Sequence, residues 1–395
     1  MMNKLVSVIL LKELKDMLRD KKTIIVSLLI PLLLMPVLSF IMGKTMNSAK
    51  DDVNQNTKIV MVDKGSSSLG KILKKDKSIK FISGTDGQGA VKDGKALLSI
   101  EIPKDFDAFI SKGNNSGIKI FYDNTSQKSS IALSKVTVII DELSKEIVGN
   151  RLTKRNIDIK ILTPITVAKT SFQKEENAQS QMMLGILIPM FILLYSATGT
   201  IAAATDIGAG EKERGTLEPL LTTKAGRHYI LTGKLFAITI MGFIVSVCSM
   251  LGLLISMKIP GGMFENGSSA IALGYKAIAL IGVIAIITTI FFGALELAVS
   301  IYARSFKEAQ TYLVPFSIVP LFAAYGTMFM DAKNIPFLYF NIPLLSVSSV
   351  VKELTSGIYN YGHIGITIVW SIVYTIVAII LARHMFNKES VIFRS

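Results

Sequence analysis

Residues 182–204 read MMLGILIPMFILLYSATGTIAAA, and after one threonine residues 206–228 read DIGAGEKERGTLEPLLTTKAGRH. The first stretch has no charged residue, and as a helix it is long enough to cross a hydrocarbon layer about 30 Å thick. The second combines dense charge with an apolar group formed by Leu217, Leu220 and Leu221. Because one membrane span is followed by such a segment, we expect further spans in the chain.

Five more apolar runs qualify, so the sequence predicts an α-helical polytopic membrane protein with six transmembrane helices. Of the 395 residues 50% are apolar, and the mean hydropathy is +0.49. The predicted spans are roughly Thr23–Met42, Met182–Ala204, Leu235–Met257, Ala277–Ala303, Thr311–Met330 and Ile364–Ala382.

The formal net charge of +14 comes from Lys and Arg residues that sit largely at the ends of apolar runs and in one polar insert. This placement suits membrane rims facing anionic lipid, so we expect no nucleic-acid partner. The basic N-terminal segment, the loops after spans 2 and 4 and the basic tail belong in the cytoplasm. We therefore predict a multi-pass cell-membrane protein with both termini cytoplasmic and no cleavable signal peptide.

Residues 1–22 are predicted to form a cytoplasmic amphipathic helix before span 1, which occupies residues 23–44. Its apolar side is expected to hold Val6, Leu10, Leu14, Met17 and Leu18. The basic residues of its flank are Lys4, Lys12, Lys15 and Arg19. Such a helix can lie in the membrane interface and bind lipid phosphates, or it can pack on protein.

Residues 45–178 are predicted to form an extracytoplasmic α/β domain with the order β-α-β-α-β. The expected strands are Lys58–Val62, Ala96–Ile102 and Ile118–Tyr122, and the expected helices are Ser67–Lys74, Pro103–Ser111 and about Ile131–Asn156. Residues 179–395 hold spans 2–6. Within them, residues 336–357 are predicted to form either an outer re-entrant or interfacial pair of short helices or a folded outer loop.

No catalytic motif is present. The nearest approach to a phosphate-binding loop is GRHYILTGKL at residues 226–235, where the glycine spacing is wrong and Leu235 cannot bind magnesium. The single cysteine, Cys248, excludes a disulfide or a Cys/His zinc site within one chain. We therefore expect a non-catalytic chain without metal or cofactor, driven by another subunit or by an ion gradient.

The charged loop between spans 2 and 3 is predicted to contain a short helix at 211–226. Leu217 is expected to open the short helix and Thr216 to cap it, so that Pro219 falls in its first turn, and Gly215 and Gly226 bracket the unit. Such a helix, with apolar side chains and charged flanks, would fit into the groove of a partner and transmit force to both spans. The alternative is a solvated turn.

Residues 210–234, GEKERGTLEPLLTTKAGRHYILTGK, closely resemble the segment after span 2 of ABC-2-type permeases. The stretches KELKDMLRDKKT (12–23), ARSFKEAQTYLVP (303–315) and FNKESVIFR (386–394) resemble the sodium-efflux branch of that family. Residues 341–357 depart from that branch, because serines stand where we expect an asparagine. In the family the first segment is the coupling helix, so the resemblance implies ATPase contact by Glu211, Lys212, Glu213, Arg214, Gly215, Thr216, Leu217, Glu218, Pro219, Leu220 and Leu221.

The resemblance implies a permease subunit of an ATP-driven sodium exporter. Its expected partners are two copies of a cytoplasmic ABC ATPase, which bind ATP and magnesium, a second six-span chain, most simply an identical one, and membrane lipid. Three alternatives remain open: export of a peptide, drug or lipid by the same machinery, gradient-driven secondary transport, and ligand sensing by the outer domain.

Glu296 is the acidic residue that lies well inside a predicted span. It precedes Arg304 by eight residues, so it lies about 12 Å from the cytoplasmic end of its helix. A charge at that depth normally faces the bundle interior or a wet path. Glu296 is therefore either an ion-pathway residue or a buried polar strut, paired with Lys234 or with a hydroxyl group.

Overall fold

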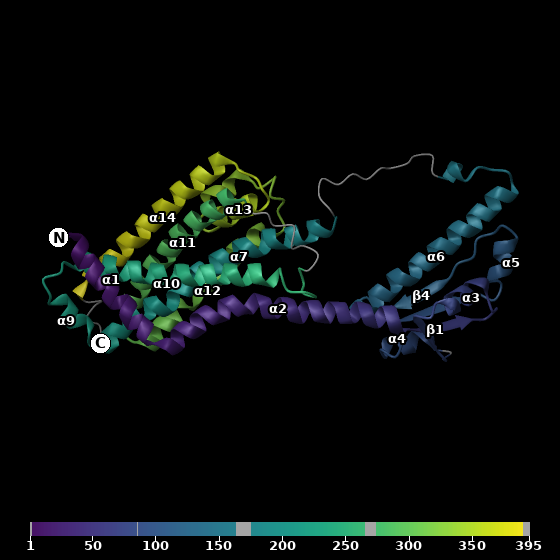
Figure 1. Cartoon of the computed structure of the whole chain (residues 1–395), viewed down its shortest axis with the longest axis horizontal. Coiled ribbons are helices and arrows are strands. Elements are labelled where there is room, and N and C mark those ends of the chain that lie inside the picture. Colours follow the sequence, from purple (N-terminus) through teal and green to yellow (C-terminus); the bar gives the residue numbers. More distant parts are fainter. Residues whose placement is uncertain (1, 85, 163–174, 265–273, 390–395) are drawn as a thin grey trace. The chain divides into compact units, whose positions relative to one another are not determined.

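The computed structural model describes residues 2–84, 86–162, 175–264 and 274–389. The chain divides into two compact units, which are Met1–Ile41 with Ser171–Ser395, and Met42–Thr170. The first is helical, and the second combines a sheet with helices (Figure 1).

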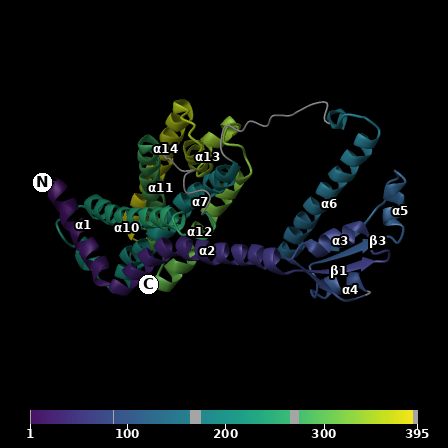
Figure 2. The same cartoon turned by 45° about the vertical axis from the view of Figure 1, so that its right-hand side comes forward.

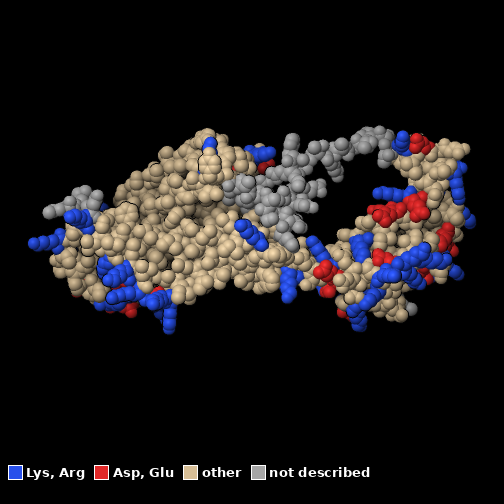
Figure 3. Space-filling model, in the orientation of Figure 1, with Lys and Arg blue, Asp and Glu red and all other residues tan. Residues whose placement is uncertain are grey.

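Among the described residues, six helices are long and apolar enough to cross a membrane, which confirms the predicted fold class. They are α2 (Lys21–Asn56), α7 (Glu175–Thr205), α10 (Arg227–Ser256), α11 (Tyr275–Tyr302), α12 (Phe306–Met328) and α14 (Tyr361–Asn387). Each extends beyond its predicted bounds at one end at least, because hydropathy detects the apolar part of a helix and misses its polar end turns. On the face shown in Figure 3, the middle of this unit carries few charged side chains.

Prolines lie inside three of these helices without ending them: Pro31 and Pro36 in α2, Pro189 in α7, and Pro315 and Pro320 in α12. A proline removes one N–H donor and leaves a carbonyl without its helical partner. Membrane helices accept this where neighbouring helices or side chains satisfy the freed group. The spans are therefore continuous helices and not pairs of half-helices.

Helix α7 packs against α10, α11 and α12, and the three runs α7, α10 and α11 lie side by side in both views (Figures 1 and 2). Gly242 of α10 marks the closest approach. A Cβ atom there would come within 2.3 Å of the Thr200 methyl carbon of α7 and 2.8 Å of the Thr289 methyl carbon of α11. Small residues at such crossings allow membrane helices to gain van der Waals contact.

The sequence left two possibilities for residues 336–357, a pair of short helices or a folded loop. The structure has two short helices, η4 (Phe337–Asn341) and α13 (Leu345–Thr355). Helix α13 packs against α7, α11, α12 and α14. Its buried Lys352 donates to the carbonyl groups of Thr327 and Met328 at the end of α12, the latter at 2.9 Å. A basic side chain at this position satisfies carbonyls that a helix end leaves without partners. We call this end of the helical unit the distal end.

The α/β unit has four strands in the order β2-β1-β3-β4. The strands are β1 (Thr57–Asp63), β2 (Ile79–Ile82), β3 (Leu98–Ile102) and β4 (Lys119–Tyr122). Strand β1 pairs in parallel with β2 and β3, and β4 runs antiparallel to β3. The helices are α3 (Ser68–Lys75), α4 (Gly87–Lys92), α5 (Phe106–Ser111), α6 (Gln127–Lys154) and the 3₁₀ turn η1 (Ile159–Leu162).

Strand β2 and helix α4 were not predicted. Strand β2 has only four residues, and helix α4 lies in a glycine-rich stretch that the sequence indicates as a loop. The Asp86 side chain accepts from the Gly89 amide at 2.8 Å and starts this helix, as an N-cap does. Ala132 and Val136 of α6 are fully buried in the same core as β1 and β3.

Candidate functional site

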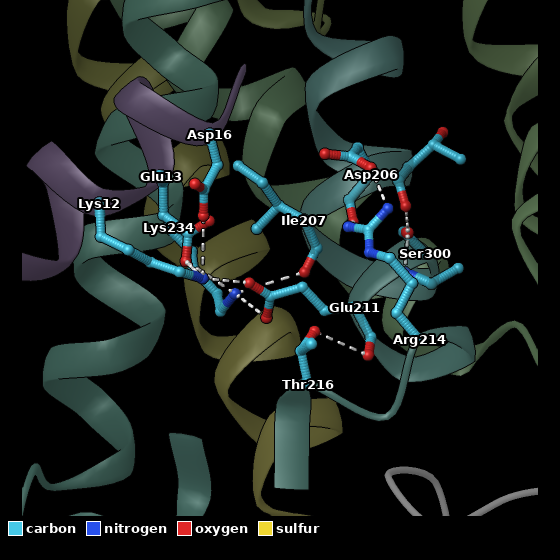
Figure 4. A network of polar contacts seen from close by, with 12 residues as sticks. Lys12, Glu13, Asp16, Asp206, Ile207, Glu211, Arg214, Thr216, Lys234 and Ser300 are labelled. Atoms are coloured by element: carbon cyan, nitrogen blue, oxygen red, sulfur yellow. Dashed lines mark hydrogen bonds and ion pairs between the residues drawn. The ribbon is translucent and has the colours of Figure 1, made fainter. Parts of the chain in front are cut away.

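Several segments that are far apart in sequence meet at the other end of the helical unit, which we call the basal end. They are α1 (Met2–Arg19), the segment that follows α7, the start of α10, the α11–α12 link and the last turns of α14. The segment after α7 contains the π-helix η2 (Asp206–Gly210), α8 (Glu211–Glu213) and α9 (Leu217–Leu221). Figure 4 shows the polar contacts among α1, the segment after α7, α10 and α11.

The π-helix η2 is fixed against α11. In a π-helix the backbone hydrogen bonds skip one extra residue, and such turns are often found at functional sites. The Ser300 hydroxyl accepts from the Ala209 amide at 2.9 Å. Gly208 permits this approach, because a Cβ atom there would lie 2.4 Å from the Ser300 oxygen. The chain after α7 is therefore packed against and hydrogen-bonded to α11.

Four charged side chains form a buried charge network, which consists of Lys12 and Glu13 from α1, Glu211 from α8 and Lys234 from α10 (Figure 4). Lys234 Nζ pairs with Glu211 Oε2 and, at 3.1 Å, with Glu13 Oε1. Lys12 Nζ lies 2.6 Å from Glu211 Oε1 and 3.2 Å from Glu13 Oε1. Lys12 Nζ, on a partly exposed side chain, also lies 3.7 Å from Asp16 Oδ2 of its own helix. The buried carboxylates of Glu13 and Glu211 are thus the two that pair with Lys234.

Three members of this network are almost inaccessible, since the side chains of Lys234, Glu13 and Glu211 are 1%, 3% and 5% exposed. Buried charges are tolerated where each has a partner. Burial by itself would lower the pKa of Lys12, but hydrogen bonds and the negative charges of Glu211 and Glu13 outweigh it and raise that pKa. The network therefore holds α1, α8 and α10 in one register.

The other polar residues of the segment make separate links. Lys212 Nζ donates to the Ala303 carbonyl at 3.2 Å, and Glu213 Oε2 accepts from the Phe306 amide at 2.7 Å, which ties α8 to the link before α12. Arg214 donates to Asp206 at 2.8 Å, and this hydrogen bond raises the pKa of Arg214. Residues 211–214 are thus fastened to the bundle.

The segment 211–226 contains two short helices, α8 and α9, and the second opens at Leu217 as predicted. Gly215 has a φ of +67°, which favours glycine and ends α8, and α9 begins at Leu217. Thr216 is at the predicted cap position but does not cap, because its hydroxyl donates to the Glu211 carbonyl at 3.2 Å.

Leu217 presents no apolar surface to a partner, whereas contact through Leu220 and Leu221 stays a prediction. Leu217 is 3% exposed and lies in the chain's own core, and Leu220 and Leu221 are partly buried against the same core. The exposed side of the segment is polar, and it consists of Glu213, Arg214, Gly215, Thr216, Glu218, Pro219, Thr222, Thr223 and Lys224.

Helix α1 packs on protein through Ile9, Glu13 and Met17, which are buried. Leu18, predicted on the apolar side, is 60% exposed, and Val8 and Leu11 are exposed as well. Of the predicted basic residues, Lys12 enters the charge network, whereas Lys15 and Arg19 are exposed. The helix therefore has one protein-bound face and one exposed face with apolar and basic side chains.

Glu296 lies in α11, outside the charge network, and is 0% exposed. The predicted pairing with Lys234 is absent, since Lys234 is taken by Glu13 and Glu211. Sequence reasoning missed the partners of Glu211. Two features of the sequence could have indicated these partners. Glu13 is an acidic residue on the packed side of a basic helix, and Lys234 is a lysine just before an apolar run.

The described part of the chain holds no group of three or more His, Cys, Asp or Glu side chains placed to bind a metal ion together. The α/β unit has a hollow of about 290 Å³ with a mainly apolar lining, to which Arg151 contributes. One guanidinium nitrogen of Arg151 donates to the carbonyls of Ile110 and Asn114, so this charge serves the fold.

The fold and the anchored basal segment define a multi-pass membrane protein with an α/β domain inserted after its first span. The chain belongs to the ABC-2 transporter family, because the family model described as ABC-2 family transporter protein matches residues 21–383. Proteins of this family are membrane subunits that work with an ABC ATPase.

The chain is similar to the ABC transporter permease protein NatB of Bacillus subtilis (strain 168). The two are 29% identical over 381 residues, which cover 96% of this chain and 97% of that protein. No solved structure matches the chain.

Proposed function

We propose that this chain is the permease subunit of an ATP-driven exporter, and that the segment Glu211–Leu221 receives the force of a separate cytoplasmic ATPase. One observation carries the proposal. The segment is anchored in the bundle through the buried charge network and the Ser300 contact, while the outer side of α9 stays exposed. Displacement of α9 would therefore move α1, α10 and α11 together.

The exposed polar side of α9 is the docking surface in this proposal, in place of the buried Leu217. Glu218 and Lys224 place charges of opposite sign on it, and Pro219 and Thr222 lie between them. Charges at the rim of an interface set orientation and association rate. The complementary groove of the ATPase would carry charges of the opposite order.

The positive-inside rule supports a cytoplasmic location for the basal end, for both termini and for α9. The α/β unit, inserted after a single span, would then be extracytoplasmic. The complex would contain a second permease chain, most simply an identical one, and two ATPase subunits that hold ATP and magnesium.

Sodium is the proposed cargo. It rests on the resemblance of residues 12–23 and 303–315, and of the tail at 386–394, to the sodium-efflux branch. The last five positions of that tail stretch lie outside the described residues. Peptide, drug or lipid export by the same machinery is the competing proposal within the family.

The test is sodium transport in liposomes that contain the chain and the ATPase encoded beside it. We expect radiolabelled sodium to move only when ATP and the ATPase are both present. Sodium movement by the chain alone would indicate a secondary transporter, and ATPase stimulation by amphiphiles in place of sodium would indicate a larger cargo.

The docking surface is tested in the same liposomes by Glu218→Lys combined with Lys224→Glu. We expect ATP-dependent export to fall while thermal stability is unchanged, because both side chains are exposed and neither forms a hydrogen bond or ion pair with the described residues. The matched control is Glu142→Lys on the exposed side of α6, which should leave export intact. Unaltered export by the α9 variant would contradict the docking proposal.

A further inference from the structure

Glu296 is the most unusual buried group in the helical unit. It is 0% exposed within the apolar helix α11, and neither of its carboxylate oxygens has a hydrogen-bond partner among the described residues. An unpaired ionised carboxylate in such a place is costly by several kcal/mol or more. The carboxyl group therefore needs either a proton or a cation.

The two lysines of the neighbouring segments α8 and α10 do not supply this positive charge. Lys234 on α10 is held by Glu13 and Glu211, and Lys212 on α8 donates to the Ala303 carbonyl. Glu296 is therefore not a structural residue paired with Lys234. The remaining candidate for a neighbour is a hydroxyl group.

That neighbour is Thr200 on α7, whose side chain is close enough to interact with the carboxyl group. Its hydroxyl group lies within hydrogen-bond distance of two carbonyls of its own helix, those of Ala197 at 2.7 Å and Ser196 at 3.1 Å. While the hydroxyl donates to either carbonyl, its oxygen lone pairs are open to a cation held by Glu296. One turn earlier on α7, Ser196 is also fully buried, and its hydroxyl oxygen has no partner among the described residues.

The α11 residues Thr289, Gly293, Glu296 and Ser300 recur at helical spacing, so they share one face of that helix. Gly293 lies between α10 and α7, since a Cβ atom there would come 3.1 Å from Ile238 and 3.7 Å from the Thr200 methyl carbon, and Ser300 binds the Ala209 amide of η2. This face of α11 therefore meets α10 as well as α7 and its basal continuation.

We propose that Glu296 is the anionic ligand of a sodium site between α7 and α11, with the Thr200 hydroxyl oxygen as a second ligand. In this proposal an unpaired carboxyl group in such apolar surroundings carries a proton when no cation is bound, and sodium takes the place of that proton. Carboxylate and hydroxyl oxygens are the hard donors that such a cation takes. This inference names the ion site of the proposed sodium exporter and rests on that function for its choice of cation.

The test uses the purified full chain in lipid nanodiscs, without an ATPase. Binding of radiolabelled sodium is measured for the wild type and for Glu296→Gln, Glu296→Asp and Thr200→Val. We expect saturable binding that is lost in E296Q, retained with reduced affinity in E296D, and weakened roughly tenfold in T200V through loss of one ligand.

The matched control is Thr198→Val on the same helix. Thr198 also donates to a carbonyl of its own helix, that of Leu194 at 2.9 Å, but it faces another side of α7. We expect wild-type sodium affinity in T198V. Wild-type sodium binding by E296Q would overturn the inference.

A second readout locates the site. Dicyclohexylcarbodiimide modifies protonated carboxyl groups in apolar surroundings, and the modified residue is identified by mass spectrometry. We expect modification of Glu296 in choline buffer and protection by sodium, whereas modification of Glu353, at the distal end, should not respond to sodium. Modification of Glu296 that ignores sodium would overturn the inference.

These experiments separate the inference from the proposed function. Sodium binding at Glu296 without ATP-driven export would leave the site standing and remove the exporter proposal. ATP-driven sodium export by E296Q at the wild-type rate would do the reverse.

Discussion

At the scale of single residues, the charge of Glu211 is used inside the protein. In sequence it is one of several charged residues in a loop, and the structure places it between Lys12 and Lys234. Replacing a whole buried ion pair with apolar residues is often neutral, whereas removing one partner is costly. We interpret the network as the element that fixes the register of α8 against α1 and α10.

A mutant cycle tests this interpretation. Glu211→Gln should lower the stability of the purified chain by about 3–5 kcal/mol, because it leaves Lys12 and Lys234 to share Glu13. Lys234→Met should act similarly, and the double variant Glu211→Met, Lys234→Met should recover most of the loss. Thermal unfolding in detergent ranks the stabilities of the wild type, the two single variants and the double variant.

The control for this cycle is Glu142→Gln, an exposed residue of α6. Its stability should equal that of the wild type. If Glu211→Gln behaved like this control, the network would have no structural role and the proposed force path would lose its first link.

At the scale of elements, the packing of α7, α10 and α11 depends on the absence of a side chain at Gly242. Gly242→Ala should cost about 1–3 kcal/mol of stability, since the new methyl group would overlap Thr200 and Thr289. Gly282→Ala in α11 is the control, because nothing lies within 4 Å of that position. Alanine there should be neutral or stabilising by up to about 1 kcal/mol. Equal melting temperatures for the two variants would contradict this packing.

The two faces of α1 make a separate prediction. Lys15→Gln with Arg19→Gln should reduce the stabilisation that anionic lipid gives to the chain, because both residues are exposed beside apolar side chains. Lys12→Gln should lower the melting temperature whether or not anionic lipid is present. Melting curves with phosphatidylglycerol and with phosphatidylcholine distinguish the two effects, and an identical response of the two variants would refute the division of faces.

The elements differ in how well the sequence could predict them. The six spans were predictable, because a run of apolar residues long enough to cross a bilayer has few alternatives. Strand β2 was not, since four residues carry too little pattern, and α9 turned its leucines inward because the core beside α1 offered them burial. Nor could composition pair Glu13 with Lys234, which lie 221 residues apart.

At the scale of the whole molecule, a series of contacts connects the exposed side of α9 to the helices of the bundle. It begins at the exposed side of α9 and passes through the charge network to α1 and α10, and through Ser300 to α11, where Glu296 lies. Each contact on this path joins segments that are distant in sequence. The proposed ATPase would act at the α9 end of this series of contacts, and the proposed sodium site lies at the Glu296 end.

The most direct test of the central claim is photo-crosslinking from position 218 in the assembled complex. A photoreactive residue at Glu218 should form a covalent product with the ATPase subunit, and one at Glu142 of α6 should not. A product from position 142 with none from position 218 would contradict the account.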